Sequence, residues 1–258
     1  MKRLFFFLLL ILININISVA QSPSVNTPKR DAKNKIQPPT IIESNSIFQL
    51  GNKTVVIPPP IGFEEALSQS EFVRRHFSAT NAANLDLLAV HVPNEKMDRL
   101  RTGIKEELSF YTHVSIPKQF REVDTSANDF SAIISYAQTN SGKVFDFNSP
   151  AMKSLRETQN KNLTELLERE AKIDFSKPVN LGEIIKTPAS YGTLLLIKTK
   201  IQVGNLQEEV VLLCGTGMVR VEQRVIFAHT YKFFKSKEDI EMVKEFSKKW
   251  LDEIVKAN

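Results

Sequence analysis

The residues most able to do chemistry in this chain are four histidines, one cysteine and dispersed carboxylates. No two histidines have the local spacing of metal ligands, so any His–carboxylate site would have to be assembled by the fold. His113 shares one face of a predicted strand with Tyr111 and Ser115, which makes it the best candidate for a polar pocket. For His76 and His229, the apolar neighbours indicate partly buried, hydrogen-bonded imidazoles in the core.

The segment from Asp124 to Asp129 (Asp-Thr-Ser-Ala-Asn-Asp) resembles the Asp-Thr-Gly-Ala-x-Asp stretch of retroviral-type aspartic proteases. In those enzymes the aspartate shares a proton with its symmetry mate and activates water. The turn needs glycine where Ser126 stands, and the residues before Asp124 are mostly polar. A capping box, in which Ser126 and Asp129 begin a helix, explains the segment better.

Other catalytic signatures are absent from the sequence. There is no Gly-Lys-Ser/Thr phosphate loop, no His-Glu-x-x-His, no Gly-x-Ser-x-Gly and no Cys-x-x-Cys. The enzymatic alternative is therefore an exported hydrolase with a site assembled from His113, Asp124 and His229. These residues would have to meet in one cleft and have perturbed pKa values. The missing motifs and the dispersed candidate residues together favour a protein that is not an enzyme and needs no cofactor or metal.

The single cysteine excludes an intramolecular disulfide framework and a zinc site built on several thiolates. Cys214 ends an apolar run that begins at Val210, which is typical of a small buried hydrophobe. A reactive thiol would need a positively charged or helix N-terminal setting, and the neighbouring residues do not provide one.

Residues 1–20 predict a cleavable export signal. Lys2 and Arg3 precede an apolar run from Leu4 to Leu12, and Ser18-Val19-Ala20 places small residues at a cleavage site before Gln21. A membrane span is the alternative, but it needs about 20 apolar residues and the clean run is shorter. We expect a periplasmic or secreted protein.

The net charge gives no electrostatic argument for a nucleic-acid partner, and none is expected. Without Lys2 and Arg3 the chain keeps 32 basic and 29 acidic residues, a net charge of +3. Residues 21–40 hold four prolines and a cluster of basic side chains, which predict a flexible linker. Membrane contact is expected only through an uncleaved signal or through this basic arm.

From residue 41 onward the pattern predicts one α+β domain, 41–258. The expected elements are a hairpin (46–50 and 53–57), a helix (64–77), a strand (85–92), a short helix that closes at Gly103, a strand (108–116), a helix after Ser126, and a long helix from Ser149 to about Ala171. A weak boundary could fall near 139–149.

The last third predicts a three-stranded antiparallel meander followed by a helix that packs on it. The strands are 191–203, 206–220 and 225–234. The second half of the first strand has a solvent-exposed face, formed by Lys198, Lys200 and Gln202. Gly215 and Gly217 mark a bulge or a close backbone approach.

Two binding surfaces are candidates. One is the sheet face around Tyr111, His113 and Ser115. The other is the long helix, in which Leu163, Leu166 and Leu167 exceed what its own core needs. The sequence thus favours an exported non-enzymatic protein that binds another envelope protein or a small ligand; an envelope factor with no discrete ligand is a further alternative.

Two stretches resemble a group of uncharacterised exported bacterial proteins. They are Pro58–Phe63, after the first hairpin, and the segment from Thr230 through Ile240 to Trp250. The order of elements, an antiparallel sheet with helices on its faces, is also similar to PsbP-like domains. That resemblance implies a protein that binds or stabilises partners rather than a catalyst, and it carries over no site residues.

Overall fold

The computed structural model describes residues 46–140 and 149–258. The predicted export signal (1–20), the linker (21–40) and nearly all of the weak boundary lie outside these residues. No helix in the described part is long and apolar enough to cross a membrane.

The central element is an eight-stranded antiparallel sheet with the strand order β3-β4-β5-β10-β9-β8-β6, in which β7 pairs with the other half of β8. Its strands are β3 (Phe63–Glu65), β4 (Leu85–Pro93), β5 (Phe110–Pro117), β6 (Ala171–Phe175), β7 (Val179–Lys186), β8 (Ser190–Val203), β9 (Leu206–Val221) and β10 (Arg224–Phe233). The hairpin β1 (Ile47–Leu50) and β2 (Lys53–Val56) forms a separate two-stranded sheet. The α+β class and the C-terminal meander are confirmed.

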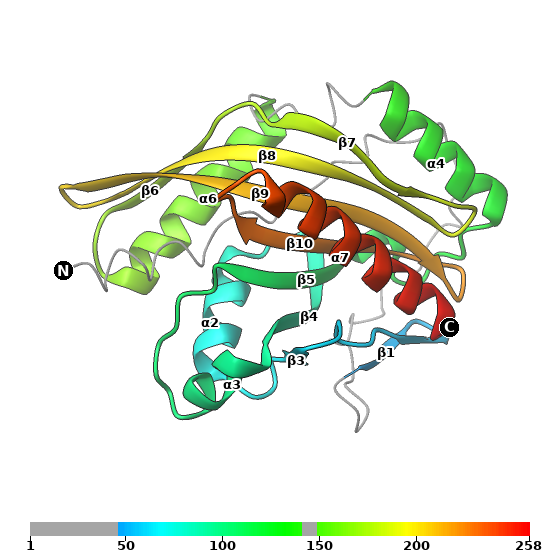
Figure 1. Cartoon of the computed structure of the whole chain (residues 1–258), viewed down its shortest axis with the longest axis horizontal. Coiled ribbons are helices and arrows are strands. Elements are labelled where there is room, and N and C mark those ends of the chain that lie inside the picture. Colours follow the sequence, from blue (N-terminus) through cyan, green and yellow to red (C-terminus); the bar gives the residue numbers. More distant parts are fainter. Residues whose placement is uncertain (1–45, 141–148) are drawn as a thin grey trace, which may run out of the picture.

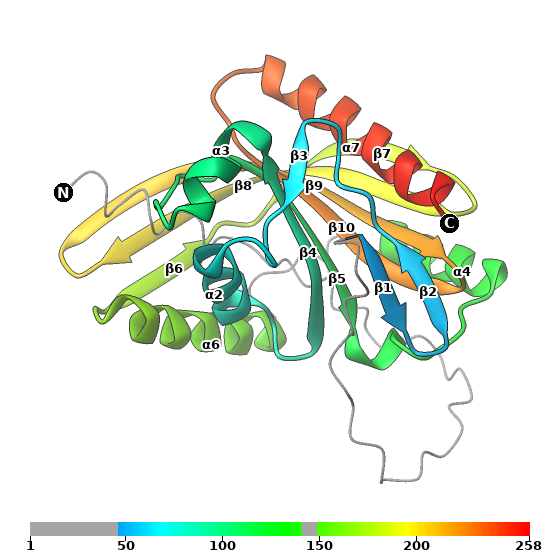
Figure 2. The same cartoon turned by 90° about the horizontal axis from the view of Figure 1, so that it is seen from below.

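Helices cover both faces of this sheet. They are α2 (Glu71–Thr80), α3 (Asn94–Arg101), α4 (Ala127–Thr139), α6 (Pro150–Leu167) and α7 (Glu238–Lys256), with a short 3-10 turn at Lys118–Phe120. Helix α7 lies in front of β8, β9 and β10, and α6 passes behind β8 and β9 near β6 (Figure 1). Figure 2 shows α2 and α6 together on the side away from α7. We call the two sides the α7 face and the α6 face.

Glycines let α7 approach the meander closely. A Cβ atom at Gly217 would stand 2.8 Å from Leu251 Cδ2, and one at Gly215 would stand 2.5 Å from Ser247 Oγ. The pairing of β9 with β8 and β10 runs through both glycines without a register shift. Of the two predicted explanations, a bulge and a close approach, the structure shows the close approach.

The first predicted helix was placed too early. Residues before Ser70 form β3 and a turn, because the Glu65 carboxylate accepts hydrogen bonds from the backbone N–H groups of Leu67 and Ser68. Ser70 then caps α2 by accepting from Val73 N–H, so the helix begins at Glu71. The capping box of Ser126 and Asp129 at the start of α4 is confirmed.

The long helix ends earlier than predicted, and the two strands that follow were missed. Helix α6 stops at Leu167, since Glu168 adopts a left-handed conformation (φ 53°). Strand β6 is short, and β7 carries two register shifts and mostly exposed residues. Residues 171–175 do alternate, but this stretch is only five residues long and directly follows a helical pattern, whereas β7 lacks the alternation from which a strand is predicted.

Candidate functional site

The predicted polar pocket lies inside the protein. Tyr111, His113 and Ser115 are on the α6 face of β5 with exposed fractions of 2%, 1% and 0%. Phe77 of α2 stacks over His113 with the ring centroids 6.2 Å apart. In the folded state these three side chains therefore form part of the core and offer no accessible surface.

The fold adds β10 residues to this cluster through cross-strand pairing. His113 is directly opposite His229, and Tyr111 is directly opposite Tyr231. The imidazole rings stack with centroids 6.0 Å apart at 22°, and the tyrosine rings stack at 5.0 Å. On the other side of β10, Thr216 is the register partner of His229. Only the tertiary structure could reveal these pairs, because the two strands are more than a hundred residues apart.

Several polar atoms in this cluster lack a hydrogen-bond partner. They are both ring nitrogens of His113, Nδ1 of His229, Ser115 Oγ and Thr216 Oγ1. Burial lowers the pKa of His229 to about 4, and burial together with the neighbouring His229 and His91 holds the pKa of His113 well below its usual range. Both rings are therefore neutral near pH 7.

The fold does not bring Asp124 to the histidine pair. Its carboxylate accepts from the Arg224 guanidinium at the start of β10, and this hydrogen bond lowers the pKa of Asp124. His229 is five residues further along the strand, a separation of about 16 Å. Among the described residues no group of three His, Cys, Asp or Glu side chains could hold a metal ion. The three members of the alternative hydrolase site thus do not form one constellation.

The thiol of Cys214 is buried on the α6 face next to Tyr231. Burial raises the pKa of this thiol far above its ordinary value, so it remains protonated at neutral pH. The prediction of a small buried hydrophobe is confirmed.

The leucines of α6 are used mainly by the core. Leu163 is fully buried, and Leu167 packs against the same cluster beneath α6. Leu166 is half-buried. The three side chains therefore do not form the exposed apolar stripe that the sequence pattern indicated.

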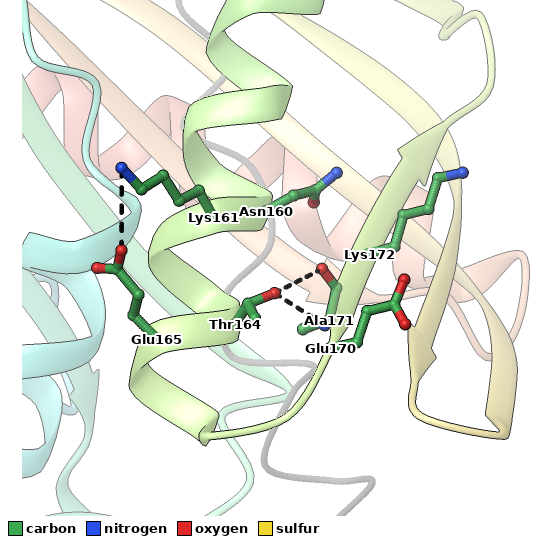
Figure 3. Close-up of a pocket in the computed structure, with 7 residues that line it drawn as sticks. All are labelled: Asn160, Lys161, Thr164, Glu165, Glu170, Ala171 and Lys172. Carbon is green, nitrogen blue, oxygen red and sulfur yellow. Dashed lines mark hydrogen bonds and ion pairs between the residues drawn. The ribbon is translucent and has the colours of Figure 1, made fainter.

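A shallow groove of about 410 Å³ lies where α6 and β6 diverge (Figure 3). It is lined by Asn160, Lys161, Thr164, Glu165, Glu170, Ala171 and Lys172. Thr164 Oγ1 accepts from Ala171 N–H at 3.0 Å, and Lys161 faces Glu165 at 4.0 Å. The groove therefore presents carboxylate and ammonium groups to solvent, beside a strand whose backbone is hydrogen-bonded to Thr164. Sequence reasoning missed it because β6 was not recognised.

The sheet is uncovered next to this groove, on the α7 face. Strands β6, β8 and β9 extend beyond the first turn of α7 (Figure 1). Lys198, Lys200 and Gln202 are exposed there, so the predicted solvent-exposed face on the second half of β8 is confirmed. Lys198 pairs with Glu209 of β9 at 3.5 Å, and both side chains are about half exposed. Lys172 belongs to both this surface and the groove.

We call this region the open end; it consists of the groove residues together with Lys198, Lys200, Gln202 and Glu209. The backbone edge beside it is closed to an added strand. Asn160 Oδ1 accepts from Ile173 N–H at 2.8 Å, and Thr164 binds the backbone of Ala171. A partner at the open end would thus meet side chains rather than unpaired backbone groups.

Comparison with known proteins gives no relative on which a function could rest. No protein-family model and no curated protein matches the chain. Among solved structures, the chain is similar to the Ran-binding protein Mog1p of Saccharomyces cerevisiae, with 14% identity over 79% of this chain and 87% of that chain and a TM-score of 0.32. A mutant form of Mog1 gives 13% identity, 79% and 86% coverage, and a TM-score of 0.29. Scores this low carry no argument about function.

Proposed function

We propose that the protein is exported and acts as a non-enzymatic binding protein, with another envelope protein as its partner at the open end. The export signal of residues 1–20 supports the location. The lack of catalytic motifs and the separation of Asp124 from the histidine pair support a role without catalysis.

The observation that best supports the proposal is the exposure of the open end. Elsewhere in the described part of the sheet, apart from the mostly exposed edge strand β7, helices or the β1–β2 hairpin cover the strands, as the buried clusters on both faces show. At the open end, exposed lysines and carboxylates lie on regular strands, and a groove adjoins them. Rigid strands hold these side chains at fixed spacings, which favours recognition of a complementary polar surface. A small ligand in the groove is the alternative occupant.

The location is tested by fractionation and by N-terminal sequencing of the mature protein. A processed form that begins at Gln21 in the periplasmic or secreted fraction is expected. An unprocessed form among cytosolic proteins would contradict export.

Binding at the open end is tested by photo-crosslinking in intact cells. A photoreactive amino acid replaces Lys200 or Lys172, and Lys249 on the solvent side of α7 serves as the matched control. The proposal expects one discrete crosslinked protein species from positions 200 and 172 and none from position 249. No adduct at any position, or the same adducts at all three, would count against the open end as the docking surface.

A further inference from the structure

The His113–His229 pair lies between the sheet and a cover made of α2 and α6. Phe77 projects from α2 onto His113, and Leu163 of α6 belongs to the same buried cluster. The two helices are tied to each other, since Gln159 Nε2 donates to Thr80 O at 2.9 Å and Asn162 Nδ2 donates to Ala79 O at 2.7 Å. They therefore form one layer over the imidazoles.

No described carboxylate faces the pair from any neighbouring element. The titratable groups beside it are neutral ones: Tyr111 on β5, Tyr231 on β10 and Cys214 on β9. On the opposite face of the sheet lies His91, which packs against Trp250. Helix α2 presents Phe77 and also carries the buried His76, whose ring packs on Phe72 of the same helix. Helix α6 presents Leu163, and the buried residues of α4 are Phe130 and Ile134. A proton on either imidazole would thus have no counter-ion.

We propose that the stacked His113–His229 pair is an acid-sensitive latch, in which protonation of one ring releases the α2–α6 cover while the α7 face stays packed. A buried imidazolium without a counter-ion is strongly disfavoured, and opening the cover gives it water. This inference is independent of the proposed docking at the open end. It rests on the export proposed above, because an exported protein meets the pH of its surroundings directly.

The two faces differ in how firmly they are held. Helix α7 fits the glycine surface of the meander, and Trp250 Nε1 donates to Pro58 O at 2.9 Å. At its end, Asn258 bonds both backbone groups of Val56. On the other face, Asn160 and Thr164 hold α6 to the backbone of β6, whereas the layer directly over the histidines is the apolar ring stack of Phe77. A charge on either imidazole would arise directly beneath this stack, so the cover is the layer that it would displace.

The size of the effect follows from proton linkage. His229 has a pKa of about 4 when covered and recovers the ordinary value of 6.5 when hydrated. Lowering the pH from 7.5 to 4.5 should therefore raise the population of the open state roughly 70-fold through this histidine alone.

The chain carries a natural reporter for each face. Cys214, the single cysteine, lies beneath the cover, whereas Trp250, the single tryptophan, lies on α7. The experiment measures labelling of Cys214 by 4,4′-dithiodipyridine, which reacts in acid, together with the emission maximum of Trp250 from pH 7.5 to 4.5. Labelling is expected to accelerate at least tenfold before the emission maximum shifts. Coincident changes in the two signals would overturn the latch, since they would indicate global unfolding.

Single-residue variants test whether His113 and His229 take up the proton that opens the cover. His113→Phe and His229→Phe keep a ring in each stack and should abolish the acid acceleration of labelling. His91→Gln, on the α7 face, is the matched control and should leave that acceleration intact. Acceleration that persists in both phenylalanine variants would overturn the proposal. The comparison of the two reporters in the unaltered protein keeps the test decisive if a variant fails to fold.

Discussion

Arg224 joins three segments that are distant in the sequence. Its guanidinium is fully buried and donates to Leu50 O at 3.0 Å, to Asn52 Oδ1 at 2.8 Å and to the Asp124 carboxylate. It thereby fixes the β1–β2 turn and the loop before α4 to the start of β10. The aspartate that resembled a protease residue therefore has a structural role.

We predict that Arg224→Met destabilises the protein by about 2–4 kcal/mol, because it leaves buried acceptors unpaired. Urea denaturation monitored by circular dichroism measures the free energy of unfolding. Arg220→Met is the control, since the Arg220 side chain donates to Thr125 O alone. Equal losses in the two variants would show that the three-way contact adds nothing.

Gly217 is one of the two glycines of β9 at which α7 packs closely against the sheet. We predict that Gly217→Ala lowers the free energy of unfolding by about 1–3 kcal/mol, because the new methyl group would meet Leu251 at 2.8 Å and Ala228 O at 3.2 Å. The double variant with Leu251→Val should lose less than the sum of the two single losses. Strictly additive losses would refute this contact as the cause.

At the scale of elements, asparagine side chains form hydrogen bonds with the backbone of edge strands, where a neighbouring strand would otherwise pair. Asn258 Oδ1 accepts from Val56 N–H at 2.8 Å, and its Nδ2 donates to Val56 O at 2.7 Å, which closes the outer edge of β2. Asn160 accepts from Ile173 N–H in the same way on the outer edge of β6. A primary amide can do this because it carries the same donor and acceptor as a peptide group.

We predict that Asn160→Leu combined with Thr164→Val makes the protein self-associate. The change leaves the backbone groups of Ala171 and Ile173 unpaired at an exposed edge, which is a template for strand addition. Light scattering after size-exclusion chromatography measures the mass as concentration rises. Thr158→Val, at an exposed position of α6, is the control and should leave the mass unchanged.

At the scale of the whole molecule, all four histidines are buried and neutral near pH 7. Burial lowers the pKa of His76 to about 4, of His91 to about 3 and of His229 to about 4, and it lowers that of His113 strongly. Between pH 6.5 and these values the unfolded chain binds protons that the native chain does not. Stability is therefore complete above pH 6.5 and falls as the pH is lowered toward 4.

We predict a loss on the order of 2–3 kcal/mol for each of His76, His91 and His229 between pH 7.5 and pH 4.5, and a further loss in the same direction from His113. Urea denaturation at a series of pH values measures it. His91→Phe should reduce the pH-dependent loss in the free energy of unfolding by the amount that His91 contributes. A free energy of unfolding that stays constant from pH 7.5 to pH 5 would contradict the burial of neutral imidazoles.

Local patterns were enough to predict much of the fold. The meander, the capping box at Ser126 and the final helix all depend on residues near one another in the chain. Hairpin pairing and helix amphipathicity are short-range properties, so their signals are present in the sequence. Strands β3 and β6 are too short for their patterns to stand out, and β7 is an irregular edge without alternation.

The sequence by itself determined the alternation of Lys198, Lys200 and Gln202, the composition of residues 1–20 and the face that His113 shares with Tyr111. Only the tertiary structure decided that this face is covered by α2 and α6, that His229 stacks on His113, and that Asp124 is held by Arg224. The physical reason is the range of the interactions. Periodicity reports which residues share a side of one element, whereas burial and pairing depend on what a distant part of the chain places against that side.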